Sequence, residues 1–128
     1  MRIERADLVR VSIIEEEPQY QSQMCDYLAA QSELQFMQAA ASVDEYLVAS
    51  KSCRFPEVVV LDIAQGNGSC CATIELLKRH NESIEVLVLS HHSEANLAFE
   101  ALSSGATGYL LKPTPLTQVK QSILDLAE

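Results

Sequence analysis

The chain has few basic residues and no long apolar stretch. Nine lysine and arginine residues stand against eighteen aspartate and glutamate residues, and the net charge is −9. The bases are scattered and form no cluster that could follow a phosphate backbone, so we do not expect this segment to bind nucleic acid itself. No apolar run is long enough for a signal peptide or a membrane span, which predicts a cytoplasmic chain without a membrane partner.

Cysteine motifs are also missing. The four cysteines are Cys25, Cys53, Cys70 and Cys71. No two of them have C-x-x-C spacing, so a zinc site shared with the histidines is not expected. Disulfides are not expected either, because the predicted compartment is reducing and the chain is long enough to form a core. We expect these residues to be small buried thiols.

Segments rich in proline or serine are absent as well. Apolar residues make up 48% of the 128 residues and charged residues 21%, which is typical of a globular chain rather than a disordered one. A chain of this size buries roughly two-thirds of its unfolded surface, enough for a single core. The sequence therefore predicts one domain that folds by itself.

Short apolar runs alternate with segments of helical periodicity along the whole chain. The runs that predict strands are residues 8–14, 34–40, 57–62, 84–90 and 107–111. Strict alternation with short loops predicts right-handed crossovers and a parallel sheet between two helical layers. The expected fold class is α/β: a flavodoxin-like (βα)5 doubly wound, parallel five-stranded sheet of order 2-1-3-4-5. A dinucleotide-binding Rossmann fold would need G-x-G-x-x-G after the first strand, where this chain has acidic residues.

Capping residues predict where the helices begin and end. The predicted N-caps are Ser42, Ser93 and Thr114, and the predicted first helical residues include Pro18 and Pro115. One helix is expected to end near His80 and another at Gly105. Serine and threonine accept hydrogen bonds from the first free N–H groups, and proline is favoured in the first helical position. Glu45, three residues after Ser42, completes a capping-box pattern.

Four of the predicted strands stop on polar residues. These residues are Glu15 and Glu16, Asp62, Ser90, and Lys112. Ligands of an open parallel sheet bind at the carboxyl ends of its strands, so these groups are expected to converge although they lie far apart in the sequence. Three carboxylates, one hydroxyl and one ammonium at a single edge predict a metal-assisted phosphoryl site.

The segments around these strand ends resemble a known family. They are Ile13-Ile14-Glu15-Glu16-Glu17-Pro18, Val60-Leu61-Asp62-Ile63, Val88-Leu89-Ser90 and Gly108-Tyr109-Leu110-Leu111-Lys112-Pro113. Together, in this order, they resemble the CheY-like receiver domain of bacterial two-component response regulators. The resemblance implies that residues 1–128 form one receiver (response regulatory) domain, the N-terminal part of a longer regulator. The last segment most resembles regulators with a LuxR/NarL-type helix-turn-helix output.

The resemblance also implies a role for each residue of the site. Asp62 would be the phosphoacceptor that attacks a phosphohistidine of a sensor histidine kinase. Ser90 and Lys112 would bind the phosphoryl group, and Tyr109 would be the aromatic switch residue that responds together with Ser90. The Lys112-Pro113 peptide bond would be cis, a geometry that X-Pro bonds reach at low cost.

A magnesium ion is implied by the same resemblance. Its ligands would be Glu15, Glu16, Asp62 and the backbone carbonyl of Ala64. Two like charges about 4 Å apart repel by about 4 kcal/mol at an effective dielectric near 20, so three acids in one crevice require a cation. The acidic pair departs from the family, which usually has aspartate at one or both positions, and Mg²⁺ tolerates little change in ligand geometry.

The loop after Asp62 is a second departure from the family. It lacks the usual methionine at Ala64 and the usual proline at Gly66, which makes it less stiff. His91 stands where receivers usually have a small residue that controls access to the phosphoacceptor.

The implied function is a phosphorylation-dependent signalling switch, not a turnover enzyme, although such a domain catalyses its own phosphotransfer and dephosphorylation. Phosphorylation would control homodimerisation through the last helices or release a DNA-binding output domain outside this chain. The alternative is an atypical receiver that acts as a dimerisation or ligand-sensing module without phosphorylation. A haloacid dehalogenase-type phosphatase is disfavoured because Ala64 occupies the place of its second acid.

A structural interpretation stays open for each of these residues. Asp62 would then be a turn or N-cap aspartate, Glu15 and Glu16 a solvated acidic run before a helix, Ser90 a turn serine and Tyr109 a partly buried core tyrosine.

Overall fold

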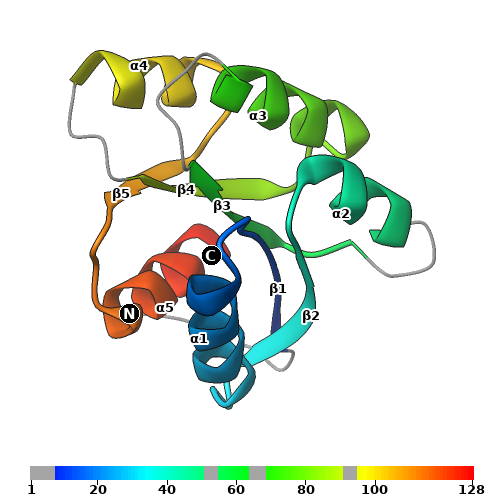
Figure 1. Ribbon diagram of the computed structural model, residues 1–128, viewed down its shortest axis with the longest axis vertical. Coiled ribbons are helices and arrows are strands. Elements are labelled where there is room, and N and C mark those ends of the chain that lie inside the picture. The colour runs from blue at the N-terminus through cyan, green and yellow to red at the C-terminus, as the bar shows by residue number, and fades with distance from the viewer. Residues whose placement is uncertain (1–7, 51–54, 64–68, 91–94) are drawn as a thin grey trace.

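The computed structural model describes residues 8–50, 55–63, 69–90 and 95–128, which form a single sheet with helices on both of its faces (Figure 1). The strands are β1 (Val9–Ile14), β2 (Leu34–Ala40), β3 (Val58–Ile63), β4 (Glu85–Ser90) and β5 (Gly108–Leu111). The helices are α1 (Pro18–Ala29), α2 (Val43–Ala49), α3 (Ser69–His80), α4 (Ala95–Ser103) and α5 (Leu116–Leu126). Every predicted element is present, and the predicted alternation is confirmed.

The five strands are all parallel and lie in the order β2-β1-β3-β4-β5, which confirms the predicted topology. The central strands β1, β3 and β4 are apolar and almost fully buried, as expected for strands covered on both faces. The edge strands are more exposed. Between β1 and β2 the register shifts after Val11, so that β2 carries one additional residue there.

Two apolar cores hold the helices against the sheet. One is formed with α1 and α5, where Met24, Leu28, Val119 and Ile123 are fully buried against strand residues. The other lies on the opposite face, where α2, α3 and α4 contribute buried side chains such as Tyr46. Figure 1 shows these two helical layers on either side of the sheet. This arrangement leaves the strand ends as the place where polar groups can gather.

The predicted beginnings of α1 and α2 are confirmed. Pro18 is the first residue of α1. At α2, the Ser42 hydroxyl accepts a hydrogen bond from Glu45 N at 3.2 Å. The Glu45 carboxylate accepts from Ala41 N at 3.3 Å, one residue before the N–H group of an ideal capping box.

The predicted ends of α3 and α4 are also confirmed, while the cap of α5 is not. Gly105 follows α4 with a φ of 121°, a conformation that favours glycine. Pro115, not Thr114, is the N-cap of α5, because its ψ of 140° is extended and helical geometry begins at Leu116. The Thr114 hydroxyl donates to the Leu111 carbonyl instead of capping the helix. The Ser93 cap predicted for α4 lies outside the described residues.

The expectation of buried thiols holds only in part. Cys25 and Cys71 are free thiols and are half-buried at the margins of the two cores. The Cys71 thiol donates to the Glu100 carbonyl at 3.6 Å, which links α3 to α4. In the described ranges no helix has both the length and the apolar character needed to span a bilayer.

The buried hydroxyl of Ser12 gives a first prediction. Ser12 lies in β1, is fully buried, and its Oγ has no hydrogen-bond partner among the described residues. A buried polar group without a partner costs about 1–3 kcal/mol, so we expect Ser12→Ala to raise the free energy of unfolding by about 1 kcal/mol. Urea denaturation measures this change.

The matched control is Ser42→Ala, which removes the N-cap of α2. We expect this variant to lower the free energy of unfolding by about 1 kcal/mol. A destabilised Ser12→Ala variant would mean that the Ser12 hydroxyl does form a stabilising hydrogen bond.

Candidate functional site

The candidate site lies at the carboxyl ends of four strands. Ile14 of β1 pairs with Leu61 of β3, so that the next residue of each strand, Glu15 and Asp62, is polar and lies at the same edge. Ser90, the last residue of β4, pairs with Leu111 of β5. Lys112 follows directly, and its backbone N–H donates to the Ser90 carbonyl at 2.7 Å. The parallel register thus brings together residues that are up to 97 positions apart.

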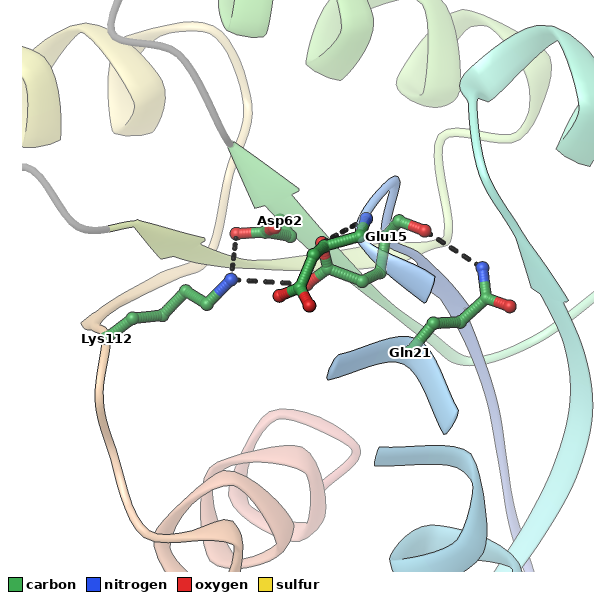
Figure 2. A network of polar contacts seen from close by, with 5 residues as sticks. Glu15, Gln21, Asp62 and Lys112 are labelled. Atoms are coloured by element: carbon green, nitrogen blue, oxygen red, sulfur yellow. Dashed lines mark hydrogen bonds and ion pairs between the residues drawn. The ribbon is translucent and has the colours of Figure 1, made fainter. Parts of the chain in front are cut away.

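The ammonium of Lys112 joins the two carboxylates. Its Nζ lies 2.9 Å from Asp62 Oδ1 and 3.2 Å from Glu15 Oε1 (Figure 2). The side chains of Lys112, Glu15 and Asp62 are only 6%, 0% and 2% exposed. Charged groups are rarely buried unless they are paired, and here one cation serves two anions. The site therefore has an excess of one negative charge.

The backbone and side chain of Glu15 are held by the turn that leads into α1. Glu15 Oε2 accepts from Glu17 N at 3.1 Å, and Glu15 N donates to the Ala40 carbonyl at 2.8 Å. The Gln21 amide donates to the Glu15 carbonyl at 2.9 Å, as Figure 2 shows. Gln21 was not among the predicted site residues. Its only signal was its place in the first turns of the helix that follows the acidic run.

Tyr20 of α1 is a second residue near the site that the pattern of strand ends did not indicate. Lys112 Nζ lies 4.0 Å from the centroid of the Tyr20 ring, within the range of a cation–π contact. The ring packs at the margin of the core formed with α1 and α5. Among the described residues, the buried Tyr20 hydroxyl has no hydrogen-bond partner.

Burial and the excess charge shift the pKa of Glu15. Desolvation, followed by the hydrogen bond and the charge of Asp62, raises its pKa to about 7, because these effects outweigh the lowering by the Glu17 N–H and Lys112. Burial lowers the pKa of Lys112, but the hydrogen bond and charge of Asp62, together with Glu15, outweigh burial, and the net shift is upward. Lys112 is therefore held in its charged form, whereas the positive charge near Glu15 is not enough to stabilise its carboxylate.

Glu16 lies apart from this buried group. Its side chain is exposed, whereas Glu15 is fully buried, although the two are neighbours in sequence. Within the described ranges, no three acidic, histidine or cysteine side chains are arranged to hold a metal ion. The chemistry of the donors nevertheless fits Mg²⁺, because two buried carboxylates share a single cation and oxygen is the ligand that Mg²⁺ prefers. Glu16 would have to turn inward to add a third carboxylate.

The predicted switch residues lie on β4 and β5. Ser90 is 1% exposed and stands opposite Ile63, the residue after Asp62. Tyr109 is half-buried and packs against the core on the side of α2, α3 and α4. The Lys112-Pro113 peptide bond is cis, as the resemblance implied. Ala64, the predicted carbonyl ligand, and His91 lie outside the described residues.

Comparison with known proteins identifies the family. Residues 11–124 match the family described as the response regulator receiver domain. The chain therefore belongs to this family, whose members are signalling modules of two-component systems.

The relatives include transcriptional regulatory proteins and response regulators. The chain is 29% identical over 73 residues, 57% of its length, to the probable transcriptional regulatory protein NarL of Mycobacterium tuberculosis, of which the match covers 34%. It is 21% identical over 115 residues, 90% of its length, to the response regulator protein VraR of Staphylococcus saprophyticus, of which the match covers 54%. The chain thus spans about half or less of these relatives.

A solved structure supports the fold. The signal receiver domain of the putative response regulator NarL from Mycobacterium tuberculosis has a TM-score of 0.83 and 24% sequence identity, and the match covers 94% of this chain and 97% of that domain. At this identity the similarity establishes the flavodoxin-like receiver fold.

The raised pKa of Glu15 predicts a pH-dependent stability. The carboxyl has an ordinary pKa of 4.5 and a folded-state pKa of about 7, so the folded state binds the proton more tightly. Stability from this group is present below pH 4.5 and is lost as the pH rises to about 7. We expect Glu15→Gln to remove this pH-dependent loss of stability, which is on the order of 2 kcal/mol. The substitution should therefore raise Tm in EDTA at pH 8 and raise it much less at pH 5.

Thermal denaturation at both pH values measures this difference. Glu16→Gln is the matched control, because the exposed neighbour should show no pH-dependent advantage. An equal effect of Glu15→Gln at both pH values would contradict the assignment.

Proposed function

We propose that this chain is the phosphoacceptor receiver domain of a response regulator, phosphorylated on Asp62 by a sensor histidine kinase. The observation that carries the proposal is the Lys112 ammonium, which lies 2.9 Å from Asp62 Oδ1 at the carboxyl edge of the sheet. A cation at this place can stabilise negative charge on a phosphoryl group that arrives at Asp62. Membership of the receiver family supports the same assignment.

Asp62 is the nucleophile in this proposal. An Asp62 carboxylate oxygen forms a bond to phosphorus while the bond from phosphorus to the histidine nitrogen of the kinase breaks. That nitrogen keeps the electron pair of the broken bond, and the imidazole, which carries its proton on the other ring nitrogen, leaves as a neutral group. Lys112 exchanges its contact with the carboxylate for one with a phosphoryl oxygen. The Ser90 hydroxyl, at the end of the neighbouring strand, donates to another phosphoryl oxygen. The domain thus catalyses its own phosphotransfer without being a turnover enzyme.

Magnesium is the cofactor in this proposal. Glu15, Glu16, Asp62 and the carbonyl of Ala64 would hold it, and the bound ion would neutralise charge on the phosphoryl oxygens. The excess negative charge around Lys112 and the raised pKa of Glu15 support a site that gains from an added cation. The buried Glu15 would act on the ion from inside the site and the exposed Glu16 from its rim.

The output is proposed from the relatives. The name of the NarL relative describes transcriptional regulation, and the matched stretch covers 34% of that relative and 54% of the VraR relative. We therefore propose that this receiver is the N-terminal part of a longer cytoplasmic regulator with a DNA-binding output domain. Phosphorylation would shift Ser90 and Tyr109 and control that domain or a homodimer formed through the last helices.

A second candidate function rests on the contacts that Lys112 makes with two carboxylates. Lys112 already bridges Glu15 and Asp62, and the described residues contain no three-ligand metal cluster. A receiver in which Lys112 keeps Asp62 engaged would act as a dimerisation or ligand-sensing module without phosphorylation. The two functions differ in their response to phosphodonors.

Asp62→Asn tests the phosphoacceptor. With acetyl phosphate and Mg²⁺, we expect the intact wild-type protein to gain the mass of one phosphoryl group and Asp62→Asn to gain none, because the amide is not a nucleophile for phosphorus. Mass spectrometry of the intact protein measures the change. Asp44→Asn, which alters an exposed aspartate of α2, is the control and should be phosphorylated like the wild type. No mass gain in the wild type, with acetyl phosphate or with a cognate kinase, would favour the second function.

The two glutamates are tested by the dependence on magnesium. We expect EDTA to abolish the mass gain and Glu16→Gln to raise the Mg²⁺ concentration needed for half-maximal phosphorylation by about tenfold, since loss of one ligand costs about 1.4 kcal/mol or more. Glu17→Gln is the matched control, because Glu17 is the N-cap of α1 and its side chain forms no capping hydrogen bond. Unchanged Mg²⁺ dependence in Glu16→Gln would remove Glu16 from the metal site.

A further inference from the structure

The two acidic residues do not account for all the N–H donors of the Lys112 ammonium. An ammonium has three N–H donors, and two carboxylates contact this one. The Lys112 side chain is 6% exposed, so little water can reach the remaining side of the ammonium. The described contact that remains is the ring of Tyr20, with its centroid 4.0 Å from Nζ.

The Tyr20 ring is itself fixed in place. Tyr20 is the third residue of α1, which begins at Pro18, and its ring packs against the core shared by α1 and α5. Gln21, the next residue, donates to the Glu15 carbonyl at 2.9 Å and ties the same turn to the end of β1. The first turn of α1 therefore holds both Glu15 and the ring against Lys112.

The hydroxyl of Tyr20 does not explain why a tyrosine stands at this position. It is buried and has no hydrogen-bond partner among the described residues, which is unusual for a buried tyrosine. A tyrosine present for its hydroxyl would be expected to show a partner for it. The contact that the side chain does make is between its ring and the cation.

We propose that Tyr20 is a positioning residue whose ring holds the Lys112 ammonium beside Glu15 and Asp62. The inference rests on the proposed function in one respect, because Lys112 is the cation that is expected to bind the phosphoryl group. A cation is attracted to an aromatic face out to about 6 Å from the centroid. Lys112 can therefore exchange a carboxylate oxygen for a phosphoryl oxygen while it stays on the ring.

NMR spectroscopy of the full chain tests the contact directly. With ¹³C-labelled lysine, assigned through Lys112→Arg, we expect the Hε protons of Lys112 to be shifted upfield by the ring current of Tyr20. The shift should be lost in Tyr20→Leu and kept in Tyr20→Phe, which retains the ring face without the hydroxyl. Tyr27→Leu is the matched control, because Tyr27 lies on the same helix and packs against the same core.

Beryllofluoride with Mg²⁺, used as a stand-in for the phosphoryl group, tests the consequence. We expect its affinity to fall by about two- to thirtyfold in Tyr20→Leu, the range that a cation–π contact of roughly 0.5–2 kcal/mol gives at 1.4 kcal/mol per factor of ten. Tyr20→Phe should recover most of the loss, whereas Tyr27→Leu should bind like the wild type. A merely structural role of Tyr20 would not move the Lys112 signal and the affinity together.

The outcomes are distinguishable from those of the proposed function. An unshifted Lys112 signal in the wild type, or an affinity unaffected by Tyr20→Leu, would overturn the positioning role. If the wild type binds no beryllofluoride, the proposed function fails, and the ring-current shift still decides whether Tyr20 holds Lys112. Should Tyr20→Leu fail to fold, cross-relaxation between the ring protons of Tyr20 and Lys112 Hε in the wild type decides the contact, and its absence refutes it.

Discussion

The arrangement of the site depends on one buried ammonium between two buried carboxylates. Lys112 joins Glu15 and Asp62, which come from the beginning and the middle of the chain, and no side chain of the three is more than 6% exposed. Removal of Lys112 would cost about 3–5 kcal/mol, since it would leave two buried carboxylates without compensation, whereas removal of Glu15 leaves the balanced pair of Lys112 and Asp62. The ends of β1, β3 and β5 are thus held together by ion pairs as well as by the hydrogen bonds of the sheet. Any ligand of the site must therefore displace or join existing contacts between charged groups.

The same group would suit the domain to the proposed switch. Two carboxylates share one lysine, and burial together with the neighbouring Asp62 raises the pKa of Glu15 to about 7. The site is therefore not at its electrostatic optimum, and in the proposed function an added cation would stabilise it. A phosphoryl group on Asp62 would bring further negative charge and redirect Lys112. Ser90 is linked to Lys112 through the backbone, so that a change at Lys112 acts on the ends of β4 and β5 together.

Much of the fold could be predicted from local patterns. Apolar runs such as that of β3, with Val58, Val59 and Val60 fully buried, are long enough to identify strands, and Ser42 and Gly105 marked helix ends through backbone chemistry that acts over a few residues. Thr114 was wrong as a cap because its hydroxyl bonds to the carbonyl of Leu111. The roles assigned to Asp62, Ser90 and Tyr109 remain predictions. Convergence of their strands follows from the parallel order alone.

Periodicity and short-range backbone chemistry were enough to predict the elements, their order along the chain and the polar residues at the strand ends. From the sequence alone, nothing distinguished Glu15 from Glu16 or placed Tyr20 near Lys112. Only the tertiary structure separated the buried Glu15 from the exposed Glu16 and placed the Tyr20 ring 4.0 Å from Lys112. The physical reason is that burial and contacts between α1 and the loop after β5 arise from packing across the sheet, which no local pattern encodes.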